Sequence, residues 1–101
     1  MIGTERLADQ IRRRATQSPR LGYTVKFALT EDGVIRWDGT GAQPLIETSD
    51  GPADTTIRIS EDNLEKLLAG DLDPTLAYMT GKLKVEGSLG VAMKLTTLLG
   101  D

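Results

Sequence analysis

The stretch YTVKFALTEDGVIRWD, residues 23–38, decides the fold of this chain. Its large apolar residues recur at every second position in two runs, which is the period of strands with one buried face. The two runs are Tyr23, Val25, Phe27 and Leu29, and then Ile35 and Trp37. Asp32 and Gly33 stand between the runs and are typical of a tight turn. The stretch therefore predicts a hairpin in which Trp37 points into the same interior as Phe27 and Val25.

Three shorter patterns predict further strands along the chain. Leu45 and Ile46 follow Pro44, and a proline at this point indicates a short strand at the edge of the sheet. Residues 55–60 and 82–86 alternate between apolar and polar side chains, as half-buried strands do.

Four segments have the apolar spacing of helices. The first covers residues 4–16. The second follows Ser60, a good N-cap, and ends at Gly70. The third begins with Asp73 and Pro74, and the last covers residues 89–99 after Ser88. Because the first three strands are joined by short turns, they should be antiparallel neighbours. The predicted fold class is α+β.

Length and composition indicate one domain, residues 1–101, with an aliphatic interior. The chain has 101 residues, of which 39% are hydrophobic but only 4% aromatic. It contains no cysteine and no histidine, which excludes disulfides, thiolate nucleophiles, histidine bases and the common zinc sites. Asp71 and Asp73 resemble the opening of a calcium loop, but the remaining oxygen ligands do not follow. We therefore predict no catalytic residues, no metal site and no cofactor.

The charges are unevenly distributed. Residues 1–20 hold five arginines against two carboxylates, whereas residues 31–73 hold three basic residues against eleven carboxylates. Such an acidic middle argues against a nucleic-acid partner, which needs a continuous basic face. The run Arg12, Arg13 and Arg14 is interpreted as a solvated helix face, with transient membrane contact as the alternative. We find no signal peptide and no membrane-spanning run, so a cytoplasmic location is expected.

The last helix carries more apolar surface than one sheet contact requires. Seven apolar residues cover an arc of roughly 220° at 100° per residue. They are Leu89, Val91, Ala92, Met93, Leu95, Leu98 and Leu99. The spare surface should meet other helices, a partner subunit or a bound molecule.

The same region carries a longer pattern: AGDLDP at residues 69–74, AYMTGKLKVEG at 77–87 and LGVAMKL at 89–95. This pattern resembles the C-terminal signature of the sterol carrier protein 2 family. The resemblance implies a five-stranded, mostly antiparallel sheet covered by helices. It also implies an apolar tunnel between sheet and helices that takes fatty acids, fatty acyl-CoA, sterols or phospholipids. The implied function is a non-enzymatic intracellular lipid carrier; the alternative is an accessory module that presents a hydrophobic substrate to a separate enzyme or assembly.

Within this framework, eight apolar residues are expected to line the ligand space: Phe27, Trp37, Leu64, Leu68, Leu76, Met79, Leu89 and Met93. The chain ends without the Ser-Lys-Leu type signal that directs proteins to peroxisomes. A stand-alone bacterial member of the family is therefore the expectation.

Overall fold

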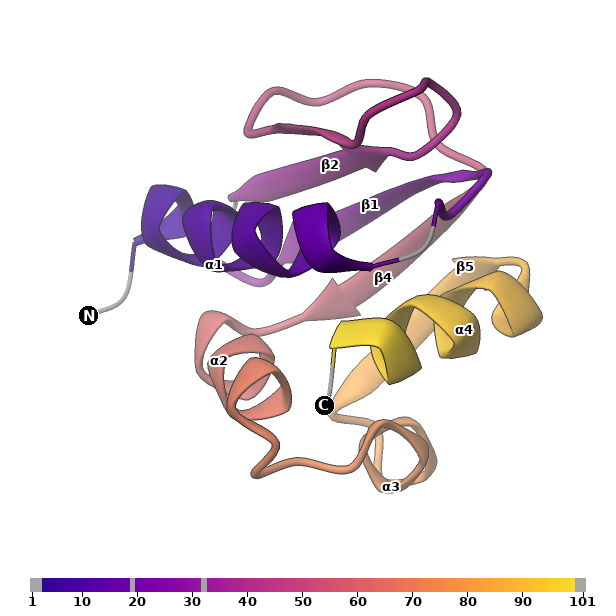
Figure 1. Cartoon of the computed structure of the whole chain (residues 1–101). Helices are drawn as coiled ribbons and strands as arrows, with labels where there is room; N and C mark the ends of the chain where they lie inside the picture. Colours follow the sequence, from indigo (N-terminus) through magenta and orange to yellow (C-terminus); the bar gives the residue numbers. More distant parts are fainter. Residues whose placement is uncertain (1–2, 19, 32, 100–101) are drawn as a thin grey trace.

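The computed structural model describes residues 3–18, 20–31 and 33–99, with side chains as far as residue 96 in the last helix. Within these residues the helices and strands follow one another as drawn in Figure 1. They are α1 (Thr4–Gln17), β1 (Thr24–Leu29), β2 (Val34–Asp38), β3 (Leu45–Glu47), β4 (Thr55–Ile59), α2 (Glu61–Ala69), α3 (Pro74–Met79), β5 (Leu83–Gly87) and α4 (Leu89–Leu99). This order confirms the α+β prediction. None of the described helices is both long enough and apolar enough to cross a bilayer.

Local polar groups set the ends of the helices that follow β4. The Ser60 hydroxyl accepts a backbone N–H of the first turn of α2 at 3.1 Å. Gly70 ends this helix in the left-handed conformation, with φ of 81°. The Asp73 carboxylate accepts the backbone N–H of Leu76 at 3.3 Å, and Pro74 lies in the first turn of α3. The predicted start of each of these helices is therefore confirmed.

The sheet has the strand order β3-β2-β1-β4-β5. The pairs β1–β2, β2–β3 and β4–β5 are antiparallel, whereas β1 and β4 run parallel in the middle of the sheet. The mostly antiparallel sheet is therefore confirmed, as is the edge position of β3. The parallel central pair was not predicted from the sequence pattern.

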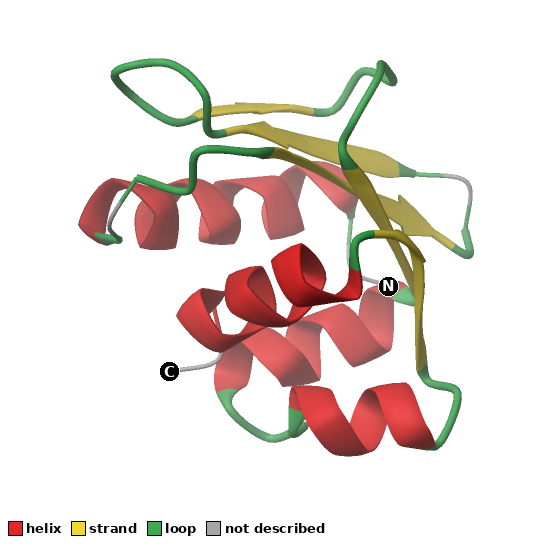
Figure 2. Cartoon of the chain, turned by 90° about the vertical axis from the view of Figure 1, so that its right-hand side faces the viewer, coloured by secondary structure: helices red, strands yellow, loops and turns green. Residues whose placement is uncertain are grey.

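One face of the sheet carries the hydrophobic core. Val25 lies opposite Trp37 and Phe27 lies opposite Ile35 across β1 and β2, as the hairpin pattern predicts. Phe27 also lies opposite Ile57 of β4. All five side chains are buried. Figure 2 shows the helices gathered on one side of the sheet. They complete the core with Leu7, Ala8, Ile11 and Ala15 of α1, Leu64, Leu67 and Leu68 of α2, Ala77 of α3, and Ala92 and Leu95 of α4.

Tyr23 does not join the buried face that the sequence pattern predicts for it. Gly22 has a φ of 81° and turns the chain immediately before Tyr23. The strand therefore begins at Thr24, and the regular alternation of buried side chains begins at Val25. The Tyr23 side chain is 41% exposed. The ammonium nitrogen of Lys94 on α4 lies 5.7 Å from the centre of its ring.

The wide apolar arc of α4 is divided in the structure. Ala92 and Leu95 are buried, Val91 and Met93 are partly buried against the core, and Leu89 is 42% exposed. The predicted contributions of Leu98 and Leu99 lie outside the described side chains, and Asp32 of the hairpin turn lies outside the described residues.

The ladder between β1 and β2 continues one step beyond the strands, at Gly39. The Gly39 N–H donates to the Tyr23 carbonyl at 2.9 Å, and the Gly39 carbonyl accepts from Gly22 N–H at 2.9 Å. A Cβ added at Gly39 would lie 2.7 Å from Leu21 Cβ and 2.9 Å from the Tyr23 carbonyl oxygen. This close approach explains why a glycine is needed at the position.

We expect Gly39→Ala to lower the free energy of unfolding by about 1–3 kcal/mol, because the new methyl group overpacks a site closed by backbone. Gly41→Ala is the matched control, since the nearest atom to its added Cβ would be 3.6 Å away. We expect the control to change stability by less than about 0.5 kcal/mol. Urea denaturation of both variants gives the comparison, and equal stabilities would contradict the close packing at Gly39.

Candidate functional site

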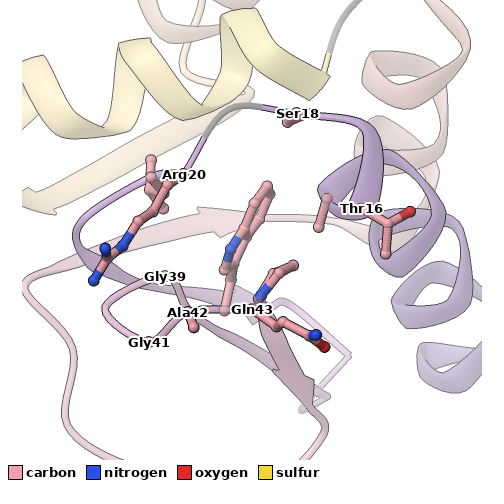
Figure 3. A pocket seen from close by; sticks show the side chains of 11 residues that line it. Thr16, Ser18, Arg20, Gly39, Gly41, Ala42 and Gln43 are labelled. Atoms are coloured by element: carbon pink, nitrogen blue, oxygen red, sulfur yellow. The ribbon is translucent and has the colours of Figure 1, made fainter.

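A pocket of about 470 Å³ opens between the end of α1 and the loop that joins β2 to β3. In Figure 3, Thr16 lies at the end of α1 and Ser18 directly after it, while Gly39, Ala42 and Gln43 come from the loop. The remaining lining residues are Ala15, Arg20, Leu21, Trp37, Gly41 and Pro44. Ala15, Leu21 and Trp37 also belong to the hydrophobic core, so the pocket joins the core to the surface.

Hydrogen bonds hold the loop that forms the outer wall of this pocket. The Asp38 carboxylate accepts the backbone N–H of Thr40 at 3.0 Å and its hydroxyl at 2.6 Å. These two bonds from Thr40 lower the pKa of the Asp38 carboxyl below its ordinary value. The Arg20 guanidinium donates to the Thr40 carbonyl at 2.5 Å. The loop therefore has a defined position against both β2 and the segment after α1.

Trp37 contributes a buried donor to the wall of the pocket. Its side chain is 1% exposed. Its Nε1 has no hydrogen-bond partner among the residues that the structure describes. An indole N–H can only donate, and leaving a buried donor unpaired costs about 1–3 kcal/mol.

A second pocket of about 260 Å³ continues the first along α1. It shares Ala15, Thr16 and Pro44 with the first pocket and adds Arg12, Leu45 and Ile46. The Arg12 guanidinium donates to the Ile46 carbonyl at 3.0 Å and to the Asp9 carboxylate at 2.5 Å. The two pockets adjoin where they share these three residues, and each has an arginine in its lining.

The structure divides the eight predicted lining residues into three groups. Phe27, Trp37, Leu64 and Leu68 meet in the core and are at most 1% exposed. Leu76 and Met79 on α3 and Leu89 at the start of α4 are 58%, 73% and 42% exposed. Met93 is partly buried and packs against the core. Only Trp37 among the eight lines the pocket.

The sequence pattern did not identify Arg20 or the loop of residues 39–44 as parts of a site. The available signal was the row of small residues at 39, 41 and 42, directly after the strand that carries the only tryptophan. Gly39 and Gly41 are typical of a flexible connection between two strands. The loop does connect two antiparallel strands, and it also forms a pocket wall.

Two of the three arginines in the run on α1 make hydrogen bonds within the protein. Arg12 reaches the edge strand, and the Arg14 guanidinium donates to the Leu68 carbonyl of α2. Arg13 is exposed. The apolar face of α1, which includes Leu7 and Ile11, is buried in the core.

The chain is similar to known proteins in sequence and in fold. The model of the SCP-2 sterol transfer family matches residues 5–100. Sterol carrier protein 2 of the rabbit, Oryctolagus cuniculus, is 41% identical over 58 residues, which are 57% of this chain and 11% of the rabbit protein. The chain thus spans only about a ninth of the length of that relative.

Two solved structures share the fold. A UbiJ-SCP2 ubiquinone synthesis protein matches with a TM-score of 0.73 and 19% identity, over 95% of this chain and 91% of its own. The apo form of sterol carrier protein 2 from Yarrowia lipolytica matches with a TM-score of 0.70 and 19% identity, over 97% and 92% of the two chains. Since the family model covers nearly the whole chain, this protein belongs to the SCP-2 sterol transfer family.

Proposed function

We propose that this domain binds a lipid and carries it without catalysing a reaction of its own. The pocket beside Trp37 is the observation that carries the proposal, because its wall includes Ala15 and Leu21 of the core. Ligand sites are typically concave and mostly apolar, with a few polar groups that orient the ligand. Membership of a sterol transfer family supports the same function.

The hydrophobic effect is large enough for such binding. Burying a chain of about fifteen methylene groups at ~0.8 kcal/mol each gives ~12 kcal/mol before costs. Loss of translational freedom and ordering of the chain reduce this value, and micromolar affinity remains within reach.

The prediction that core residues line the ligand space requires a change in the packing of the core. Phe27, Leu64 and Leu68 are buried, so a ligand reaches them only if the packing around them opens. We propose that the acyl chain enters from the pocket and replaces contacts among these core residues. Leu76, Met79 and Leu89 would then cover the ligand from α3 and the start of α4.

Presentation of a hydrophobic substrate to a separate enzyme is the second candidate function. It is favoured by the fold match to a protein named for ubiquinone synthesis. Transfer of a fluorescent lipid between vesicles by the purified domain alone distinguishes the two functions. A carrier accelerates the transfer by itself, whereas a presenting module needs its partner.

We propose that any membrane contact by α1 is transient and electrostatic. Its apolar face is occupied in the core, so exposed Arg13 and not an inserted apolar stripe would meet anionic lipid. A cytoplasmic location stays a prediction.

The lipid itself is best sought in the protein as it is purified. Extraction with organic solvent of protein prepared without detergent, followed by mass spectrometry, should yield one lipid class in a constant molar ratio. Protein that carries no lipid and binds none of the family's candidate ligands would contradict the proposed function.

Trp37 is the only tryptophan of the chain and reports directly on the pocket. We expect its emission to be blue-shifted, since the side chain is 1% exposed. Titration with a long-chain fatty acid should change that emission in a saturable way. Emission close to that of free indole, insensitive to lipid, would contradict both its burial and its place at the site.

Met93→Glu tests the predicted ligand wall on α4. A carboxylate at this partly buried position should abolish fatty-acid binding by desolvation and repulsion, with a modest loss of stability. Leu95→Glu is the matched control, because Leu95 is fully buried and its replacement should unfold the domain. Denaturation and fluorescent fatty-acid titration of both variants give the result. If the Met93→Glu variant binds the fatty acid normally, or unfolds as the Leu95→Glu variant does, then Met93 is an ordinary core residue and does not line the ligand space.

A further inference from the structure

We propose that the exposed side of α3 is the contact surface of a homodimer, in which two copies of this domain place their α3 helices antiparallel across a twofold axis. This inference goes beyond the proposed function, because α3 does not line the pocket beside Trp37. It rests on two properties of α3, which are its exposed apolar side chains and the opposite charges at its two ends.

The outer side of α3 is apolar. Leu76, Tyr78 and Met79 are 58%, 42% and 73% exposed, and they are three of the six exposed large hydrophobic residues in the part of the chain that the structure describes. Ala77 is buried, and α3 packs against β5 and α4. Since each helical residue is rotated by about 100° from the last, Met79 projects on the side opposite Ala77. Figure 2 shows α3 at the lower edge of the view, outside α4 and β5. Apolar side chains gathered on one exposed helix mark an interaction surface.

The two ends of α3 carry opposite charges. Asp71 and Asp73 precede the helix, and Lys82 follows it directly after Gly81. All three charged residues are exposed, and none of them forms an ion pair within the described residues. An anionic bilayer would attract one end of α3 and repel the other. A second copy that runs in the opposite direction attracts both ends.

The positions of these residues are self-complementary about the middle of the helix. Leu76 and Met79 lie at equal distances along the chain on either side of that point, and so do Asp73 and Lys82. An antiparallel register that places Leu76 beside Met79 of the second copy therefore places Asp73 beside Lys82 of that copy. The twofold axis repeats each contact, which gives one central apolar cluster with an ion pair at either end. A parallel arrangement would bring like charges together.

The contact is small, so the association should be weak. α3 has six residues and therefore spans about 9 Å. Stable interfaces bury about 1,200–2,000 Å² in total, which is more than one short helix and its ends provide. The ion pairs at the rim fix the orientation of the two copies more than they add affinity. We therefore expect a reversible dimer that forms as the protein concentration rises.

Sedimentation equilibrium over about 10 µM to about 1 mM protein measures this association. The protein is delipidated first, because the packing change proposed above would turn Leu76 and Met79 toward a lipid. We expect the average mass to rise from that of the 10.9 kDa monomer toward twice that value. Leu76→Ser and Met79→Ser should each weaken the association about tenfold. Thermal unfolding of both variants should stay close to that of the unmodified domain, since both side chains are exposed.

Charge variants test the antiparallel register. Lys82→Glu should weaken the association, because the new carboxylate would face the acidic end of the second α3. Asp71→Lys should weaken it by the converse repulsion, and Asp73 is left unchanged because its carboxylate caps the helix. A mixture of the two variants should associate more tightly than either variant alone, because opposite charges then meet. Lys66→Glu is the matched control: it alters the net charge equally, on an exposed residue of α2, and should leave the association unchanged.

Several outcomes would overturn the inference. A domain that stays monomeric at every concentration has no such surface. Association that persists in Leu76→Ser and Met79→Ser, or a mixture of charge variants that associates no better than its components, places the contact elsewhere. Vesicles of phosphatidylcholine, with and without phosphatidylglycerol, test the other occupant: binding that Met79→Ser abolishes, by a domain that stays monomeric, assigns α3 to the bilayer. None of these results depends on whether the pocket beside Trp37 binds a lipid.

Discussion

β1 and β4 run parallel in the middle of the sheet, with Phe27 opposite Ile57, and the other elements are arranged around this pair. Parallel neighbours cannot be joined by a tight turn. The chain therefore adds β2 and β3 on one side of β1 before it returns to form β4 on the other. This arrangement leaves β2 and β3 under α1, and it leaves β4 and β5 under α4. The helices on the two halves meet over the same buried face, as Figures 1 and 2 show.

The connection from β3 to β4, residues 48–54, is fixed on the opposite face of the sheet. The Arg36 guanidinium donates to the Pro52 carbonyl at 2.7 Å, and Lys26 pairs with Asp50 at 2.9 Å. The hydrogen bond from Lys26 lowers the pKa of the Asp50 carboxyl. Exposed pairs of this kind contribute little free energy. Their role is positional, because they hold the connection where β4 must begin.

The sequence could predict the elements because each one is decided by residues close together in the chain. Alternation gives strands, and the Ser60 and Asp73 side chains with Gly70 give helix ends. Alternation identifies the buried face of a strand but not its neighbour, so the parallel partner of β1 could not be predicted. The residues of the pocket come from α1, the segment after it, β2 and a loop, and no local pattern links them.

The same limit explains the mixed result for the predicted ligand wall. An apolar residue at helical spacing has the same pattern whether it meets the core, a ligand or solvent. Leu64 and Leu76 both follow a helix cap and both belong to an apolar stripe. Leu64 is fully buried in the core, whereas Ala77 is the buried residue of the six-residue α3 and Leu76 is exposed. Tertiary packing, and not periodicity, separates them.

The position of the pocket at the edge of the core, open to solvent, has an energetic reason. Trp37 is the largest side chain of the core, and the chain beside it contains the small residues Gly39, Gly41 and Ala42. The small residues do not fill the space beside the indole, so a hollow remains where β2 leads into the loop. An enclosed empty cavity of 470 Å³ would cost ~11 kcal/mol at ~24 cal/mol per Å³, which is comparable to the whole stability of a small domain. Because Gly41, Ala42, Gln43 and Pro44 in its wall are exposed, the hollow is open to solvent and most of that cost does not arise. The domain can therefore stay folded without a ligand and still offer core side chains to one.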